Sequence, residues 1–177
     1  MTLEKRILPE EKRRKLKELL QKQGIKRFIE VHNGISALIA NDMKIEIDAA
    51  GGVETREFDG FWESSFTDSA SKGLPDVEIV SYDSRLQTIG QILNVTNKPM
   101  IVDGDTGGEP TNFEYFVKQL EMLGVSGVII EDKKFPKRNS LSLDARQELE
   151  EPAIFVDKLQ RGKGVLTSDD FMIIARI

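Results

Sequence analysis

Two acidic motifs are candidates for metal chemistry. Asp103 and Asp105 follow the apolar run 99–102, and Glu131 follows the apolar run 127–130. Such runs are typical of parallel strands, whose carboxyl ends meet at one edge of a sheet. The three carboxylates would repel one another there unless a cation joins them. Taken singly, each motif is also typical of an ordinary polar turn or strand ending.

The composition restricts the kind of metal. The chain has one histidine and no cysteine, so a zinc site built from histidine or thiolate ligands lacks the residues it needs. Carboxylates and water suit a hard cation instead. We therefore expect Mg²⁺, with Mn²⁺ as the alternative.

Other polar residues at the same predicted edge could bind an anion. Trp62, Ser64 and Ser65 follow a predicted strand, where hydroxyl and backbone N–H groups could receive phosphate or carboxylate oxygens. Arg176 follows the last predicted strand and could pair with such oxygens bidentately. The polar, basic stretch 131–141 has the character of a lid over an anionic substrate. Each feature also has an ordinary alternative, namely a serine-rich loop, a surface ion pair or a solvated loop.

The bulk composition excludes several functional classes. A chain of 177 residues with 39% hydrophobic and 31% charged residues fits one globular domain. The net charge of −5 argues against nucleic acid as a partner, because phosphate backbones bind basic surfaces. Residues 1–17 lack the apolar core of a signal peptide or membrane helix, and there is no cysteine for a disulfide. We therefore expect a cytoplasmic protein without a membrane partner.

The elements that must position these residues alternate between strand and helix. Apolar spacing predicts helices at 9–23, 35–41, 82–95, 112–123 and 151–159, and strands at 27–31, 58–62, 99–102, 127–130 and 171–175. A serine-rich loop is predicted at 64–72, a hairpin insertion near 42–57, and a helix end at Gly124. Near-continuous apolar strands indicate an α/β fold with a parallel sheet, either a closed barrel or a doubly wound sheet.

Together the motifs resemble the phosphoenolpyruvate mutase family of the isocitrate lyase superfamily. The resemblance rests on His32-Asn33-Gly34-x-Ser36, Trp62 with Ser64, Asp103-Gly-Asp105-Thr-Gly, Glu131-Asp132-Lys133, Phe135-Pro-Lys-x-Asn-Ser-Leu141 and Ile174-Ala-Arg176. Their order and spacing match from about residue 27 onward. The resemblance implies a (β/α)8 TIM-type barrel. Such a barrel takes about 250 residues, so residues 1–177 would form the N-terminal part of a single barrel, about its first five βα units.

The resemblance also implies roles for individual residues. The magnesium carboxylates of the family would correspond to Asp103, Asp105 and Glu131. Catalytic roles would fall on Asp76 near the metal waters, on Lys137 and Asn139 of a mobile gating loop, and on Arg176. Substrate binding would fall on Trp62, Ser64, Ser65, Ser140 and Arg176.

The implied activity is the Mg²⁺-dependent interconversion of phosphoenolpyruvate and phosphonopyruvate, as in phosphonate biosynthesis. The amide of Asn139 could hold a migrating phosphoryl group without delivering water to it, which favours transfer over hydrolysis. Related lyases carry a cysteine in the gating loop, and this chain has none. Two alternatives stay open: a phosphonopyruvate hydrolase, and an inactive half-barrel that only binds metal or a partner. The expected partner is the small-molecule substrate, within a homo-oligomer.

Overall fold

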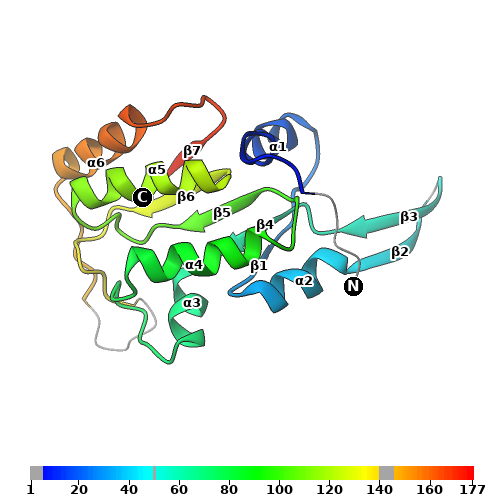
Figure 1. Cartoon of the computed structure of the whole chain (residues 1–177), viewed down its shortest axis with the longest axis horizontal. Coiled ribbons are helices and arrows are strands. Elements are labelled where there is room, and N and C mark those ends of the chain that lie inside the picture. The colour runs from blue at the N-terminus through cyan, green and yellow to red at the C-terminus, as the bar shows by residue number, and fades with distance from the viewer. Residues whose placement is uncertain (1–5, 50, 140–145) are drawn as a thin grey trace.

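The computed structural model describes residues 6–49, 51–139 and 146–177 and contains a five-stranded parallel sheet (Figure 1). In spatial order its strands are β1 (Phe28–Glu30), β4 (Gly60–Glu63), β5 (Met100–Asp103), β6 (Gly127–Glu131) and β7 (Met172–Arg176). All four neighbouring pairs are parallel. Spatial order follows chain order, as it does where each βα unit adds the next strand of a barrel wall. The predicted α/β class is confirmed.

Helices connect and cover these strands. They are α1 (Pro9–Gln21), α2 (Gly34–Asp42), α3 (Ser65–Ser71), α4 (Tyr82–Leu93), α5 (Pro110–Leu123) and α6 (Pro152–Gly164). Contacts join α2 to α4, α4 to α5, and α5 to α6, so these four helices form a row in chain order. Figure 1 shows α4 and α5 lying over the sheet. The apolar side chains between the helices and the sheet form the core.

The two faces of the sheet have different neighbours. Phe61, Val102 and Val128 are buried in one cluster with α4 and α5 residues, so their side chains face the helices. Side chains alternate along a strand, so Asp103 points to the opposite face. Glu63 is in register with Val102 and therefore points toward the helices. The sheet thus separates two acidic residues that lie close together at its edge.

The antiparallel pair β2 (Lys44–Ala49) and β3 (Gly52–Glu57) lies at the position of the expected hairpin. Figure 1 shows it projecting from the body of the molecule, beyond the end of α2. All six residues of β3 are exposed. The hairpin therefore contributes little to the core and stands apart from the strand ends that carry the predicted site.

The prediction of a loop at residues 64–72 is wrong, because most of this segment forms the helix α3. Asp68 is fully buried there, pairs with Lys72, and accepts a hydrogen bond of 3.0 Å from Thr88 on α4. Polar contacts with α4 bury one side of this helix. It has no apolar period, so the search for an apolar stripe could not detect it.

The other predicted elements are present, with small shifts at their ends. The last helix is longer than predicted and runs to Gly164. Gly124 ends α5 with a left-handed φ of 90°, which confirms the predicted glycine stop. In the described part of the chain, the helices are all too short or too polar to cross a bilayer.

Candidate active site

The carboxyl ends of three neighbouring strands carry predicted site residues. Asp103 ends β5, Glu131 ends β6 and Arg176 ends β7. Glu131 is in register with Arg176, and Asp103 is in register with Ile129. Because side chains alternate along a strand, Asp103, Glu131 and Arg176 all point to the same face of the sheet. The predicted convergence at one edge is therefore found.

A group of side chains gathers around Lys137, which lies in the loop after β6. Its Nζ lies 2.8 Å from Asp76 Oδ1 and 2.5 Å from Asp105 Oδ1, and donates to Ser65 Oγ over 2.9 Å. Ser65 Oγ in turn lies 3.1 Å from Asp103 Oδ2. We call Ser65, Asp76, Asp103, Asp105 and Lys137 the carboxylate–lysine cluster. It joins the loops that follow β4, β5 and β6.

The charges of this cluster explain why the amine of Lys137 is protonated. Its side chain is only 7% exposed, and burial alone would lower the pKa of its amine. The carboxylates of Asp105 and Asp76 outweigh burial and raise that pKa. Lys137 is therefore a fixed cation. It lies where three neighbouring carboxylates require positive charge.

Asp105 adopts an unusual backbone conformation. Its φ is 55°, in the left-handed region that aspartate tolerates better than most residues. Its N–H donates to Asp103 Oδ1 over 3.0 Å, and Gly107 and Gly108 continue the turn with positive φ values. The Asp-Gly-Asp-Thr-Gly motif thus forms a tight turn. The turn directs Asp105 back toward the strand ends.

Arg85 and Glu63 belong to this site, and the sequence reasoning missed both. Arg85 Nη1 donates to Asp105 Oδ2 over 2.9 Å, and Nη2 donates to Glu63 Oε2 over 2.8 Å. Burial raises the pKa of Glu63 to about 7 against the opposing effect of Arg85. Burial would lower the pKa of Arg85, but Glu63 and Asp105 raise it, so the guanidinium is charged. A signal was available: Arg85 lies four residues before Ile89, on the core-facing side of α4.

Glu78 is the second acidic residue that the sequence reasoning missed. Its carboxylate accepts from Thr106 Oγ1 over 2.9 Å and from Lys137 N over 3.2 Å, so it ties the loop after β5 to the loop after β6. Burial and the neighbouring Asp105 raise the pKa of Glu78 to about 6. It has a φ of 60° in a loop without apolar periodicity, and no sequence signal marked it.

The three predicted metal ligands supply the hard oxygen atoms that Mg²⁺ prefers. In the structure two of them face protein cations: Asp105 faces Lys137 and Arg85, and Glu131 pairs with Arg176. The third, Asp103, accepts from Ser65 Oγ and from Asp105 N. Across residues 6–49, 51–139 and 146–177, no three acidic, histidine or cysteine side chains are arranged to hold a metal. Asp105 Oδ1 is buried, and Lys137 Nζ lies 2.5 Å from it. The donor types fit Mg²⁺, and the metal site stays a prediction.

Comparison with known proteins places the chain in a family. A family model described as phosphoenolpyruvate phosphomutase matches residues 16–177. The chain belongs to the phosphoenolpyruvate phosphomutase family. It is 37% identical over 163 residues to a phosphoenolpyruvate phosphomutase of Tetrahymena pyriformis, covering 92% of this chain and 50% of that protein.

This chain is also similar to two further proteins of known identity. It is 39% identical over 125 residues to a phosphonopyruvate hydrolase of Variovorax sp., covering 70% of this chain and 43% of that protein. A solved phosphoenolpyruvate phosphomutase from Streptomyces platensis subsp. rosaceus superposes with a TM-score of 0.80 at 35% identity, covering 92% of this chain and 52% of that chain. The chain therefore spans about half the length of the relatives it matches.

The remaining predicted residues have different surroundings. Asn139 Nδ2 lies 3.4 Å from Asp76 Oδ2, next to the carboxylate–lysine cluster. Trp62 is partly buried on β4, in register with Ile101. Ser64 precedes α3, and its carbonyl accepts from Asp68 N over 3.0 Å. Ser140 lies outside the described residues. The fold thus brings Ser65, Asp76, Lys137 and Asn139 together with Asp103 and Asp105.

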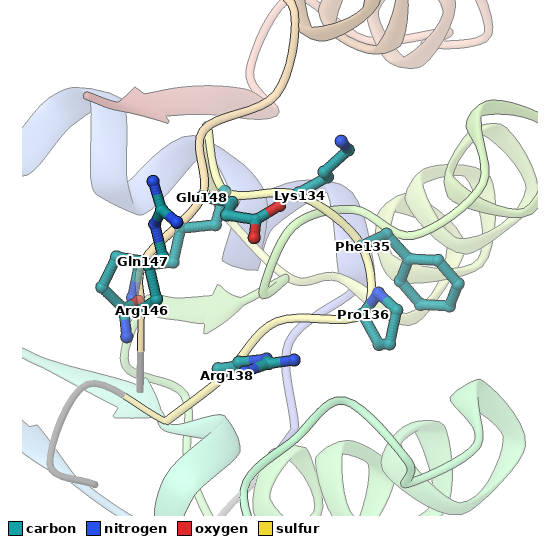
Figure 2. A pocket seen from close by; sticks show the side chains of 8 residues that line it. Lys134, Phe135, Pro136, Arg138, Arg146, Gln147 and Glu148 are labelled. Atoms are coloured by element: carbon teal, nitrogen blue, oxygen red, sulfur yellow. The ribbon is translucent and has the colours of Figure 1, made fainter. Parts of the chain in front are cut away.

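The basic loop after β6 borders a hollow of about 210 Å³. Four cationic residues line it, namely Lys133, Lys134, Arg138 and Arg146. Figure 2 shows Arg138 and Arg146 on the two chain segments that border it. The two segments pair through Lys134 N and Glu148 O at 2.9 Å. Positive charge therefore concentrates on this loop, and its role as a lid over an anionic substrate stays a prediction.

Proposed function

We propose that this chain is part of an enzyme that interconverts phosphoenolpyruvate and phosphonopyruvate with bound Mg²⁺, in phosphonate biosynthesis. The observation that carries the proposal is the carboxylate–lysine cluster, at the strand ends of a chain that matches the family model over residues 16–177. In parallel α/β folds these strand ends are where active sites lie.

The proposed ligands of Mg²⁺ are Asp103, Asp105 and Glu131. When bound, the ion would neutralise negative charge on the enolate and carboxylate oxygens of the substrate. Asp76 is linked to Asp103 through Ser65 and to Asp105 through Lys137, and it would orient metal-bound water. Manganese has the same ligand preference and is the expected substitute.

Other residues of this chain would act on the phosphoryl group. Arg176, at the end of β7, presents a planar guanidinium that suits phosphate oxygens. Asn139 can donate to those oxygens without supplying water. Lys137 adds a fixed positive charge at the cluster. Substrate binding is proposed for the four residues Trp62, Ser64, Ser65 and Ser140.

A second candidate is phosphonopyruvate hydrolysis. It is favoured by the 39% identity to the Variovorax phosphonopyruvate hydrolase. Both reactions would use one metal and one anion site, and they differ in whether water reaches the phosphoryl group. The amide of Asn139 favours transfer over hydrolysis.

One assay separates the two activities. The protein is incubated with phosphonopyruvate and Mg²⁺, and the products are followed by phosphorus NMR. Phosphoenolpyruvate is the expected product, whereas pyruvate with inorganic phosphate would identify a hydrolase. Chelation of the metal and the Asp103→Ala variant should each abolish the product while circular dichroism shows a folded chain. Undiminished turnover in Asp103→Ala would contradict the metal assignment.

The remaining expectations belong to the same proposal. The absence of cysteine favours a cytoplasmic location. A homo-oligomer stays a prediction that mass measurement in solution would test.

A further inference from the structure

Arg85 is buried and spans three acceptors at the edge of the sheet. The side chain is 2% exposed. Its Nη1 donates to Asp105 Oδ2 over 2.9 Å, while Nη2 donates to Glu63 Oε2 over 2.8 Å and also to the main-chain oxygen of Asp103. One guanidinium from α4 therefore contacts both acidic residues of the Asp-Gly-Asp turn.

The two carboxylate oxygens of Asp105 have different partners. Oδ2 is held by Arg85 on the helix side, whereas Oδ1 lies 2.5 Å from Lys137 Nζ in the carboxylate–lysine cluster. Asp105 therefore has one cation at each carboxylate oxygen. Arg85 thus fixes which oxygen of Asp105 faces Lys137 and, through it, Asp76.

The geometry suits arginine rather than lysine. A planar guanidinium can hold separate acceptors at fixed angles, whereas a lysine ammonium is a single point charge. Three acceptors hold the guanidinium of Arg85, and its Cζ lies over the Phe116 ring, 5.9 Å from the ring centre. Asp105 therefore meets a rigid donor.

Glu63 balances the charge of Arg85, with Oε2 lying 2.8 Å from Nη2. It points toward the helices and is fully buried. In the described part of the chain, Glu63 Oε1 and Arg85 Nε are both buried without a hydrogen-bond partner. A buried ion pair that leaves polar atoms unpaired contributes little to the stability of the fold. Apolar residues can often replace such a pair without loss of stability. This favours a role at the site over a role in stability.

We propose that Arg85, neutralised by Glu63, is a positioning residue that holds Asp105 Oδ2 so that Oδ1 can serve as a metal ligand. The inference rests on the metal site of the proposed function. Arg85 itself touches neither metal nor substrate in this role. It acts by orienting Asp105.

The test uses Mn²⁺ as the probe, with binding followed by electron paramagnetic resonance. The double variant Glu63→Leu, Arg85→Met removes both buried charges at once, so neither is left uncompensated. We expect it to fold, as judged by circular dichroism and urea unfolding, and to bind Mn²⁺ about ten-fold or more weakly, as is typical when the group that orients a ligand is lost. Arg85→Lys keeps the positive charge but loses the separate N–H donors of the guanidinium, and it should also weaken Mn²⁺ binding.

The unchanged chain and Asp103→Asn are the controls. Binding by the unchanged chain that is lost in Asp103→Asn establishes the metal site independently of Arg85. If the double variant then binds Mn²⁺ as tightly as the unchanged chain, the role of Arg85 is refuted and the metal site stands. If the unchanged chain does not bind Mn²⁺, both ideas fall. If the double variant does not fold, Arg85→Lys decides, and unaltered affinity in it refutes the positioning role.

Discussion

The ammonium nitrogen of Lys137 lies 2.8 Å from Asp76 Oδ1, so the loop after β6 is tied to the loop after α3. The same nitrogen lies 2.5 Å from Asp105 Oδ1. One buried cation therefore joins two carboxylates from different loops. The proposed site depends on that cation for its cohesion.

Removal of this cation should destabilise the fold in a way that Mg²⁺ repairs. Lys137→Met removes the cation beside Asp76 and leaves Asp105 with Arg85 alone, so we expect the free energy of unfolding to fall by about 3 kcal/mol, as for a broken buried ion pair. Added Mg²⁺ should restore more stability in the variant than in the unchanged protein, because it supplies the missing charge. Urea unfolding at neutral pH, with and without Mg²⁺, measures both effects.

Lys134→Met is the matched control, because Lys134 is an exposed lysine of the same loop. It should change the free energy of unfolding by no more than about 0.5 kcal/mol. A Lys137→Met protein as stable as this control would show that the ion pairs of Lys137 contribute nothing.

Loss of the Asn139 amide should affect the chemical step more than binding. Asn139→Ala is expected to lower the rate of phosphonopyruvate conversion about 100-fold, the effect seen when one donor to a transition state is removed. Affinity for oxalate, a nonreacting dianion, should change little. Gln119→Ala removes an exposed amide on α5 and controls for the substitution itself. Equal losses in rate and in oxalate affinity would reduce Asn139 to a binding contact.

Gly124 should tolerate no side chain. It has a φ of 90°, and an added Cβ would lie 2.8 Å from Pro9 Cα at the start of α1. Gly124→Ala is therefore expected to lower the free energy of unfolding by about 2 kcal/mol, from backbone strain and from displacement of α1. Thermal and urea unfolding measure this loss.

Gly164 gives the contrasting control for Gly124. It ends α6, and a Cβ there meets nothing within 4 Å. Gly164→Ala should be neutral or stabilise the protein by up to about 1 kcal/mol, because alanine restricts the unfolded chain. Equal stability of the two glycine variants would show that the close approach of α5 and α1 does not affect the free energy of unfolding.

Lys12 should make stability rise with pH. Burial, with Arg6 and Lys15 nearby, lowers its pKa from 10.5 to about 8, and its Nζ donates to the Leu93 carbonyl oxygen over 2.6 Å. Between these two pKa values the unfolded chain binds more protons than the folded chain. The folded state therefore gains stability as the pH rises from about 8 toward 10.5, by at most about 1.4 kcal/mol per pH unit.

Lys12→Met should remove that slope, so the difference in unfolding free energy between the two proteins should change across this pH window. Urea unfolding at several pH values measures the difference. Lys118→Met, at an exposed position of α5, controls for loss of one lysine. A constant difference between Lys12→Met and the unchanged protein would contradict the lowered pKa.

Much of the fold could be predicted because its signals are local. The apolar runs before Asp103 and Glu131 are β5 and β6, and the glycine after Leu123 ends α5. The helix α3 could not be found this way, because Asp68 is buried by polar contacts with α4 rather than by an apolar stripe. Local patterns detect apolar burial and miss burial that depends on a distant partner.

The candidate site likewise has a part that local patterns predict and a part that depends on packing between distant segments. Local sequence patterns predict which residues stand at the strand ends, because a buried parallel strand is apolar and its carboxyl end can be polar. Asp103, Glu131 and Arg176 follow from that rule. The contacts of Arg85 with Glu63 and Asp105, and of Lys137 with Asp76, are visible in the folded chain alone. Such pairings depend on how helices and loops pack across the sheet edge. Ion pairs between distant segments form where packing brings the charges together, and no local period records them.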